Sequence, residues 1–204
     1  IPNSGNQQGG DVQRTATQDT REEEERQAKI KRVYQIKAKL PSFQRNTYYF
    51  LYNDEVLQTA KKRGGKIIIG QGDKVHWKKD KSNYVCKIQH GEKDARIVLV
   101  SDQRFLVTYT LLPKSKKISV DVQFKYNDQN VHWYPVDESL CSYKYISPKI
   151  SGKYTHIPIK SPKNAVLQDK DGNNMLVIRR MNMHIVEVEC ETQLNPTIAF
   201  AIGL

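Results

Sequence analysis

This sequence of 204 residues lacks a long apolar segment, closely spaced cysteine pairs and recognisable catalytic or metal-binding motifs. No run approaches the roughly 18 apolar residues of a membrane-spanning helix, so no transmembrane segment is predicted. Cys86, Cys141 and Cys190 lie far apart, which excludes a Cys-x-x-Cys zinc ribbon. Their odd number leaves one thiol for an intermolecular bond in an oxidising compartment, whereas in a reducing compartment all three are small buried hydrophobic residues. Cys86 and Cys190 stand inside apolar strand patterns, so we expect both to be buried.

Catalytic motifs are missing as well. The five histidines are scattered and form no His-x-His or His-Glu-x-x-His motif. Gly65-Lys66 is followed by isoleucine rather than serine or threonine, which excludes a P-loop, and no Gly-x-Ser-x-Gly elbow is present. Glu187 and Glu189 lie two residues apart on one face of a strand pattern. A glycosidase uses a carboxylate pair, but an exposed acidic stripe is the commoner arrangement. The sequence predicts a protein that is not an enzyme and that needs no metal or cofactor.

Positive charge is what the sequence has in excess. Lysine and arginine number 33 against 22 acidic residues, a formal net charge of +11. Such an excess favours polyanions: nucleic acid, anionic lipid or an acidic protein face. The best local anion site is Lys61, Lys62 and Arg63, because the backbone amides of the following Gly64-Gly65 can cradle a phosphate. The alternative is a solvated hairpin tip.

Short strand patterns separated by turn residues dominate the chain from residue 34 onward. Their spacing of roughly 8–12 residues is typical of a sandwich or barrel. A hairpin turn is predicted at Asp171-Gly172-Asn173-Asn174. The apolar run 197–202 is expected to be a last buried strand, or an exposed edge that another chain covers. The other expected strands are 34–40, 48–52, 66–69, 74–77, 84–88, 95–100, 105–112, 118–126, 131–135, 140–146, 154–159, 165–167, 175–178 and 183–188.

Two stretches divide the chain. Residues 1–20 are polar and cannot bury enough apolar surface to offset ordering, so they predict a flexible arm. Thr20 and Glu23 form a capping box, which predicts a short helix over 21–31. Residues 113–117 read as a basic linker. The expected fold is all-β, with two antiparallel β-sandwich-like domains. The expected division is an arm and helix over 1–31, an N-terminal β domain over 32–112, the linker 113–117, and a C-terminal β-sandwich over 118–204.

The C-terminal strand-and-turn order resembles a known family. From Tyr154, a tyrosine-threonine strand, a proline, a short apolar strand, Asp-Gly, an apolar strand ending in arginine and the letters HIVEVE follow one another. This order resembles the C-terminal β-sandwich of the VirB9/TrbG/CagX family, periplasmic components of type IV secretion and conjugation machines. Gly72-Asp73 and Trp77 resemble part of that family's N-terminal domain. One departure is residues 150–153, which read ISGK where the family usually has an Asp-Asp-Gly turn.

The resemblance implies a non-enzymatic structural subunit of a secretion or conjugation channel, periplasmic and associated with the outer membrane. Its implied partners are copies of itself in a ring-like homo-oligomer and other secretion-machine subunits, including a small lipoprotein. Arg179 would brace the sandwich. Two alternatives remain open: a β-rich viral coat protein that packages nucleic acid in a virion, and a secreted binding module whose loops contact an acidic partner. The implied partner-binding residues are Tyr143, Tyr145, Tyr154, Ile157 and Cys141.

Overall fold

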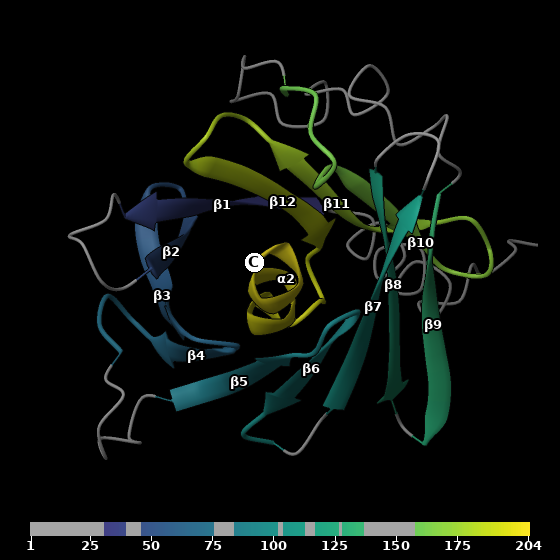
Figure 1. Cartoon of the computed structure of the whole chain (residues 1–204), viewed down its shortest axis with the longest axis horizontal. Helices are drawn as coiled ribbons and strands as arrows, with labels where there is room; N and C mark the ends of the chain where they lie inside the picture. The colour runs from purple at the N-terminus through teal and green to yellow at the C-terminus, as the bar shows by residue number, and fades with distance from the viewer. Residues whose placement is uncertain are drawn as a thin grey trace, which may run out of the picture.

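A single antiparallel sheet closes on itself in the computed structural model of this chain, which describes residues 31–39, 46–75, 84–101, 104–112, 117–126, 128–136 and 158–204. Among these residues, twelve strands form a closed barrel and one helix follows them (Figure 1). Successive strands are neighbours around the barrel, and β1 pairs with β12 to close it. The strands are β1 (Lys31–Lys39), β2 (Asn46–Tyr52), β3 (Glu55–Arg63), β4 (Lys66–Gln71), β5 (Tyr84–His90), β6 (Asp94–Leu99), β7 (Arg104–Leu112), β8 (Lys117–Tyr126), β9 (Gln129–Pro135), β10 (Ala165–Gln168), β11 (Asn174–Arg180) and β12 (Ile185–Glu191).

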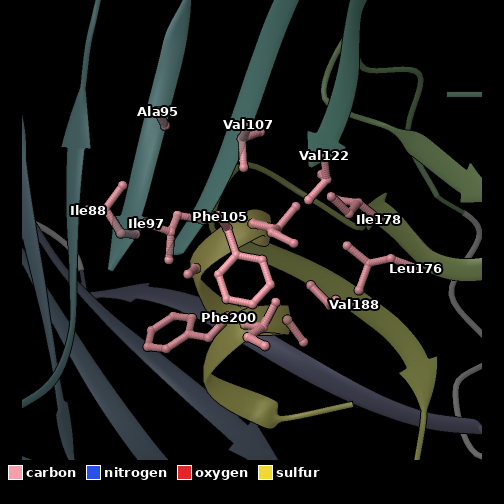
Figure 2. Close-up of a cluster of buried hydrophobic side chains, with 14 of the residues drawn as sticks. Ile88, Ala95, Ile97, Phe105, Val107, Val122, Leu176, Ile178, Val188 and Phe200 are labelled. Atoms are coloured by element: carbon pink, nitrogen blue, oxygen red, sulfur yellow. The ribbon is translucent and has the colours of Figure 1, made fainter. Parts of the chain in front are cut away.

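The two-residue alternation of the strands separates an apolar interior from a polar exterior. On β4, Ile67 and Ile69 point inward and pair with Ile88 and Cys86 of β5. The residues between them, such as Ile68, point outward because successive side chains alternate across a sheet. Figure 2 shows inward side chains from opposite walls of the barrel meeting in one cluster.

The helix α2 (Pro196–Gly203) fills the barrel, and Figure 1 shows it at the centre of the ring of strands. Asn195 caps it by accepting a hydrogen bond from the amide of Thr197 at 2.9 Å, and Pro196 occupies its first turn. Its residues from Thr197 to Ile202 are all buried, as expected for a helix that is apolar on every side. Phe200 stacks on Phe50 of β2 with ring centroids 4.7 Å apart.

Gly203 allows the end of α2 to approach the barrel wall closely. A Cβ at this position would lie 2.6 Å from Cδ1 of Ile36 and 2.7 Å from Cγ2 of Val188, closer than carbon atoms pack. Ile36 belongs to β1 and Val188 to β12, so the helix rests against the pair of strands that closes the barrel.

The predicted pair of sandwich domains is wrong. β7 and β8, on either side of the predicted linker, are hydrogen-bonded neighbours in the same sheet from Phe105 opposite Phe124 onward. The predicted strand over 197–202 is also wrong, because these residues form α2. β3 was not predicted, and Lys74 and Val75 lie outside any strand. The predicted arm, the helix over 21–30, the strand over 140–146 and residues 154–157 of the strand over 154–159 lie outside the described residues. Lys31 begins β1, and Pro158 and Ile159 lie outside any strand.

Most of the other strand predictions are confirmed, with bounds shifted by a few residues. The hairpin turn between β10 and β11 is confirmed as well, with Gly172 at a positive φ of 82°. Asp169 holds this turn, because its carboxylate accepts hydrogen bonds from the amides of Asp171 and Asn173, each at 2.9 Å. Desolvation is the largest single influence on Asp169 and raises its pKa, but the hydrogen bonds from Asn173, Asp171 and Gly172 together outweigh it and lower the pKa.

Candidate functional site

Cations gather on the outer face of β3 to β8. The register of the strands places Lys61, Ile68, Lys87, Val98 and Arg104 in one row across five neighbouring strands. Cations therefore alternate with aliphatic side chains along this row. A second row runs beside it through Arg63, Lys66, Gln89, Arg96 and Leu106. With Lys125 on β8, seven cations share this surface, which we call the basic face: Lys61, Arg63, Lys66, Lys87, Arg96, Arg104 and Lys125.

Part of the basic face is hollowed. A groove of about 1170 Å³ lies over β5 to β9, and Lys87, Arg96, Arg104 and Lys125 line it. Among the described residues that line the groove, Asp94 is the single carboxylate. None of the seven cations forms an ion pair with another described residue. The groove therefore presents positive charge that the described part of the protein leaves largely uncompensated.

A second acidic residue, Asp121, lies beside the groove and already has hydrogen-bond partners. Asp121 on β8 pairs with the Nε2 of His132 on β9 and accepts a hydrogen bond from Gln123 at 3.2 Å. The ring of His132 also contacts that of Tyr134, with centroids 3.8 Å apart. This polar cluster borders the cations without neutralising them.

The structure separates the three cations predicted as one anion site. Lys61 and Arg63 face outward on β3 and join the basic face, whereas Lys62 points inward and lines a cavity at the end of the barrel. Alternation along the strand is the reason. Gly64 does occupy a tight turn, with a φ of +58°. The predicted partner-binding residues Tyr143, Tyr145, Tyr154, Ile157 and Cys141 lie outside the described residues.

Sequence reasoning missed the cations that strands β5 to β8 contribute. Lys87, Arg96, Arg104 and Lys125 stand singly in the chain, so no local cluster marks them. A weaker indication was present in the sequence: each of these cations stands at a polar position of a strand in which apolar and polar residues alternate. Assembling them required the order of the strands.

A buried ionic cluster lies on the outer side of β11 and β12. Nη1 of Arg179 is 2.7 Å from a carboxylate oxygen of Glu189, and its Nε is 3.5 Å from one of Glu187. All three residues are 1% exposed, so the expectation of an exposed acidic stripe is wrong for Glu187 and Glu189. The carboxylates share a guanidinium and are closed off from solvent, which suits bracing of two strands rather than work on a substrate.

The two described thiols are structural. Cys86 and Cys190 are free and buried, as predicted. Burial raises the pKa of each to about 12, and the carboxylate of Glu189 contributes at Cys190. A thiol with such a pKa is protonated at neutral pH, so neither cysteine is an activated nucleophile.

Comparisons with known proteins leave the site to be judged on its geometry. No family model matches this sequence, and no curated protein matches it. Within the described ranges, no three histidine, cysteine or acidic side chains come together as a metal site. In the same part of the chain, no helix has the length and apolar character needed to cross a membrane.

Proposed function

We propose that this protein is a non-enzymatic binding module whose basic face docks on an anionic, phosphate-bearing lipid surface. The observation that carries this proposal is the set of seven cations, spread over six adjacent strands, that no described residue pairs. The set supports contact with an extended anion. Neighbouring strands lie about 4.8 Å apart, so Lys61 on β3 and Lys125 on β8 are separated by roughly 24 Å along the sheet. A single phosphate cannot span that distance.

The expected electrostatic binding free energy suits reversible docking. A lysine or arginine near an anionic membrane surface contributes roughly 1 kcal/mol. Seven such residues contribute up to about 7 kcal/mol, less where the curved wall holds some of them away from the surface. This interaction weakens with salt, because ions screen it over about 10 Å at 0.1 M.

Aliphatic side chains between the cations favour lipid over nucleic acid. Ile68 and Val98 separate the cations of the first row, and Leu106, 37% exposed, follows Arg96 in the second. Val100, 60% exposed, follows β6 and precedes Ser101, which lines the groove. Binding of single-stranded nucleic acid uses aromatic rings on which bases stack. The exposed ring of Tyr134 lies on β9, outside the two rows of cations. Aliphatic groups among cations instead suit the boundary between headgroups and acyl chains.

The secretion-channel hypothesis stays a prediction. Its implied contact residues, from Cys141 to Ile157, lie outside the described residues. The predicted pair of sandwich domains, the second of which carried the resemblance, is replaced by one barrel. The lipid-docking proposal keeps the non-enzymatic, partner-binding part of that hypothesis and places it on a different surface.

Vesicle co-sedimentation tests the proposal. We compare wild type with the triple variant Lys87→Gln, Arg96→Gln and Arg104→Gln, on vesicles of phosphatidylcholine with or without about 30 mol% phosphatidylserine. Wild type should bind the anionic vesicles and release them in high salt. The triple variant should bind roughly 100-fold more weakly, because it loses three contributions of about 1 kcal/mol each.

A matched control has the same net charge. Lys39→Gln, Lys160→Gln and Lys170→Gln remove three exposed lysines away from the basic face and should change binding by less than about 3-fold. Equal loss in both triple variants would show a nonspecific effect of net charge and overturn the proposal. Single-stranded RNA is included at the same salt concentration. Tighter binding to RNA than to vesicles, lost in the first triple variant only, would replace the lipid surface with nucleic acid.

A further inference from the structure

The end of the barrel near the C-terminal end of α2 contains a second cavity, of about 410 Å³. In Figure 1 this end faces the viewer, where the C mark stands at the tip of the helix. Its apolar lining comes from the inner wall and the helix, and includes Ile36, Val120, Ile178, Val186 and Ile202. We call this cavity the mouth.

Three cations from separate parts of the chain meet at the mouth. Lys62 reaches it from β3, Lys163 from the turn before β10, and Arg180 from the end of β11. No aspartate or glutamate is among the described residues that line it. Leu204, the last residue of the sequence, also lines the mouth, but neither its α-carboxylate nor either lysine makes an ion pair with a described residue. Burial lowers the pKa of Lys163, and the positive charges of Arg180 and Lys62, which line the same cavity, act in the same direction.

A histidine at the mouth has an unsatisfied polar atom. His90 is the last residue of β5 and lines the mouth, and its Nε2 is buried with no hydrogen-bond partner among the described residues. Burial and the neighbouring Lys62 lower the pKa of His90. A buried polar atom without a partner is costly, and most such atoms in folded proteins are satisfied by a neighbour, water or ligand.

Hydrogen bonds within the protein hold Arg180 and the turn that carries Lys163 in place. The guanidinium of Arg180 donates to the carbonyls of Asn182 at 3.1 Å and Met183 at 3.0 Å. These acceptors are neutral, so they orient the charge without cancelling it. The backbone amide of Arg180 donates to Oδ1 of Asn164 at 2.8 Å, and Asn164 also donates to the carbonyl of Ile159 at 2.9 Å. Asn164 is 2% exposed, and it anchors the turn that carries Lys163.

The helix dipole is the competing explanation for these cations. The C-terminal end of α2 carries partial negative charge, which attracts positive side chains. However, its last turn contains no basic residue, and neither Lys62 nor Lys163 donates a side-chain hydrogen bond to a described residue. The dipole therefore offsets part of the repulsion but leaves the charges free to bind an anion.

We propose that the mouth binds a small amphiphilic anion, with a phosphate or carboxylate head between Lys62, Lys163 and Arg180 and an apolar tail on the aliphatic lining. The volume lies within the usual range of roughly 300–1,000 Å³ for small-molecule sites. This site is separate from the basic face, because Lys62 points to the opposite side of the sheet from Lys61. The inference does not depend on membrane docking.

Calorimetric titration with octyl phosphate tests the proposal, alongside inorganic phosphate and octanol. Octyl phosphate should bind one to one, at least 10-fold more tightly than either of the other two compounds. Lys62→Gln should weaken this binding at least 10-fold, whereas Lys61→Gln should change it less than 2-fold. Because the two lysines are neighbours on β3, the pair controls for charge, strand and composition.

Several results would overturn the inference. Equal affinities of Lys62→Gln and wild type would refute the site, and equal affinities for octyl phosphate and phosphate would refute the apolar half of it. If Lys62→Gln does not fold, Lys163→Gln, in the turn before β10, replaces it. If the three cations only stabilise the C-terminal end of α2, wild type should not bind octyl phosphate, and that result would also overturn the inference. Vesicle docking is measured on the same variants, so failure at the mouth and failure at the basic face remain distinguishable.

Discussion

Replacing Arg179 by methionine removes a guanidinium that two buried carboxylates share. Arg179 is 1% exposed, and its shorter contact, to Glu189, is 2.7 Å. Removing one partner of a buried ion pair typically costs about 3–5 kcal/mol, because the other charge stays buried. For a domain of this size, each kcal/mol lowers the melting temperature by roughly 2–4 °C. We therefore expect Arg179→Met to unfold about 6–20 °C below wild type.

Thermal and urea unfolding, followed by circular dichroism, measure this effect. Arg96→Met is the matched control, since Arg96 is exposed on the outer face and should change stability by less than about 0.5 kcal/mol. Replacing the whole cluster, by Arg179→Met together with Glu187→Leu and Glu189→Leu, should recover much of the lost stability, because apolar groups of similar volume often substitute well for buried ion pairs. An Arg179→Met protein within about 1 kcal/mol of wild type would refute the reasoning.

Two further predictions concern groups whose pKa the fold shifts. Burial and Lys62 lower the pKa of His90 below its ordinary 6.5, so the unfolded chain binds this proton more readily than the folded protein does. The free energy of unfolding should therefore fall as the pH is lowered through about 6.5, and urea titrations should show a smaller fall for His90→Gln; identical pH dependence would contradict this. Cys86 and Cys190, each with a pKa of about 12, should resist iodoacetamide at neutral pH in the native protein and react in urea. Peptide mass spectrometry reads both sites, and rapid native labelling would show that the barrel opens.

Strands with large inward side chains were predictable from the sequence. β8 is an example, because Val120 and Val122 are apolar and buried while Asp121 and Gln123 point outward. β3 escaped prediction because its inward positions include Gln58 and Lys62. Gln58 is polar for a reason that depends on tertiary structure: it donates a hydrogen bond of 2.7 Å to Thr197 at the start of α2. The residues around Gln58 in the sequence do not predict that contact.

The helix was mistaken for a strand because periodicity cannot classify a short run that is apolar on every side. Asn195-Pro196 did offer a helix-start signal, since asparagine favours the capping position and proline the first turn. The number of domains was a different difficulty. Alternation looks the same in two sandwiches and in one barrel, and the pairings of β7 with β8 and of β1 with β12 distinguish them. The basic face also depends on the long-range register of the strands. The net charge therefore predicted a positively charged surface, but not which strands carry it.

The position of α2 in the chain has a consequence for how this protein is made. The helix that fills the interior follows the twelve strands of the described residues, and the first of these strands pairs with the last. At about 5–20 residues per second, a ribosome needs roughly 9–35 s to go from β1 to the end of α2. During that time the apolar inner faces of the strands lack the helix that packs against them in the folded protein. We therefore expect folding to be largely post-translational and slow, as is usual when non-local pairings dominate. Nascent chains that stop before Pro196 would be the species most prone to aggregate.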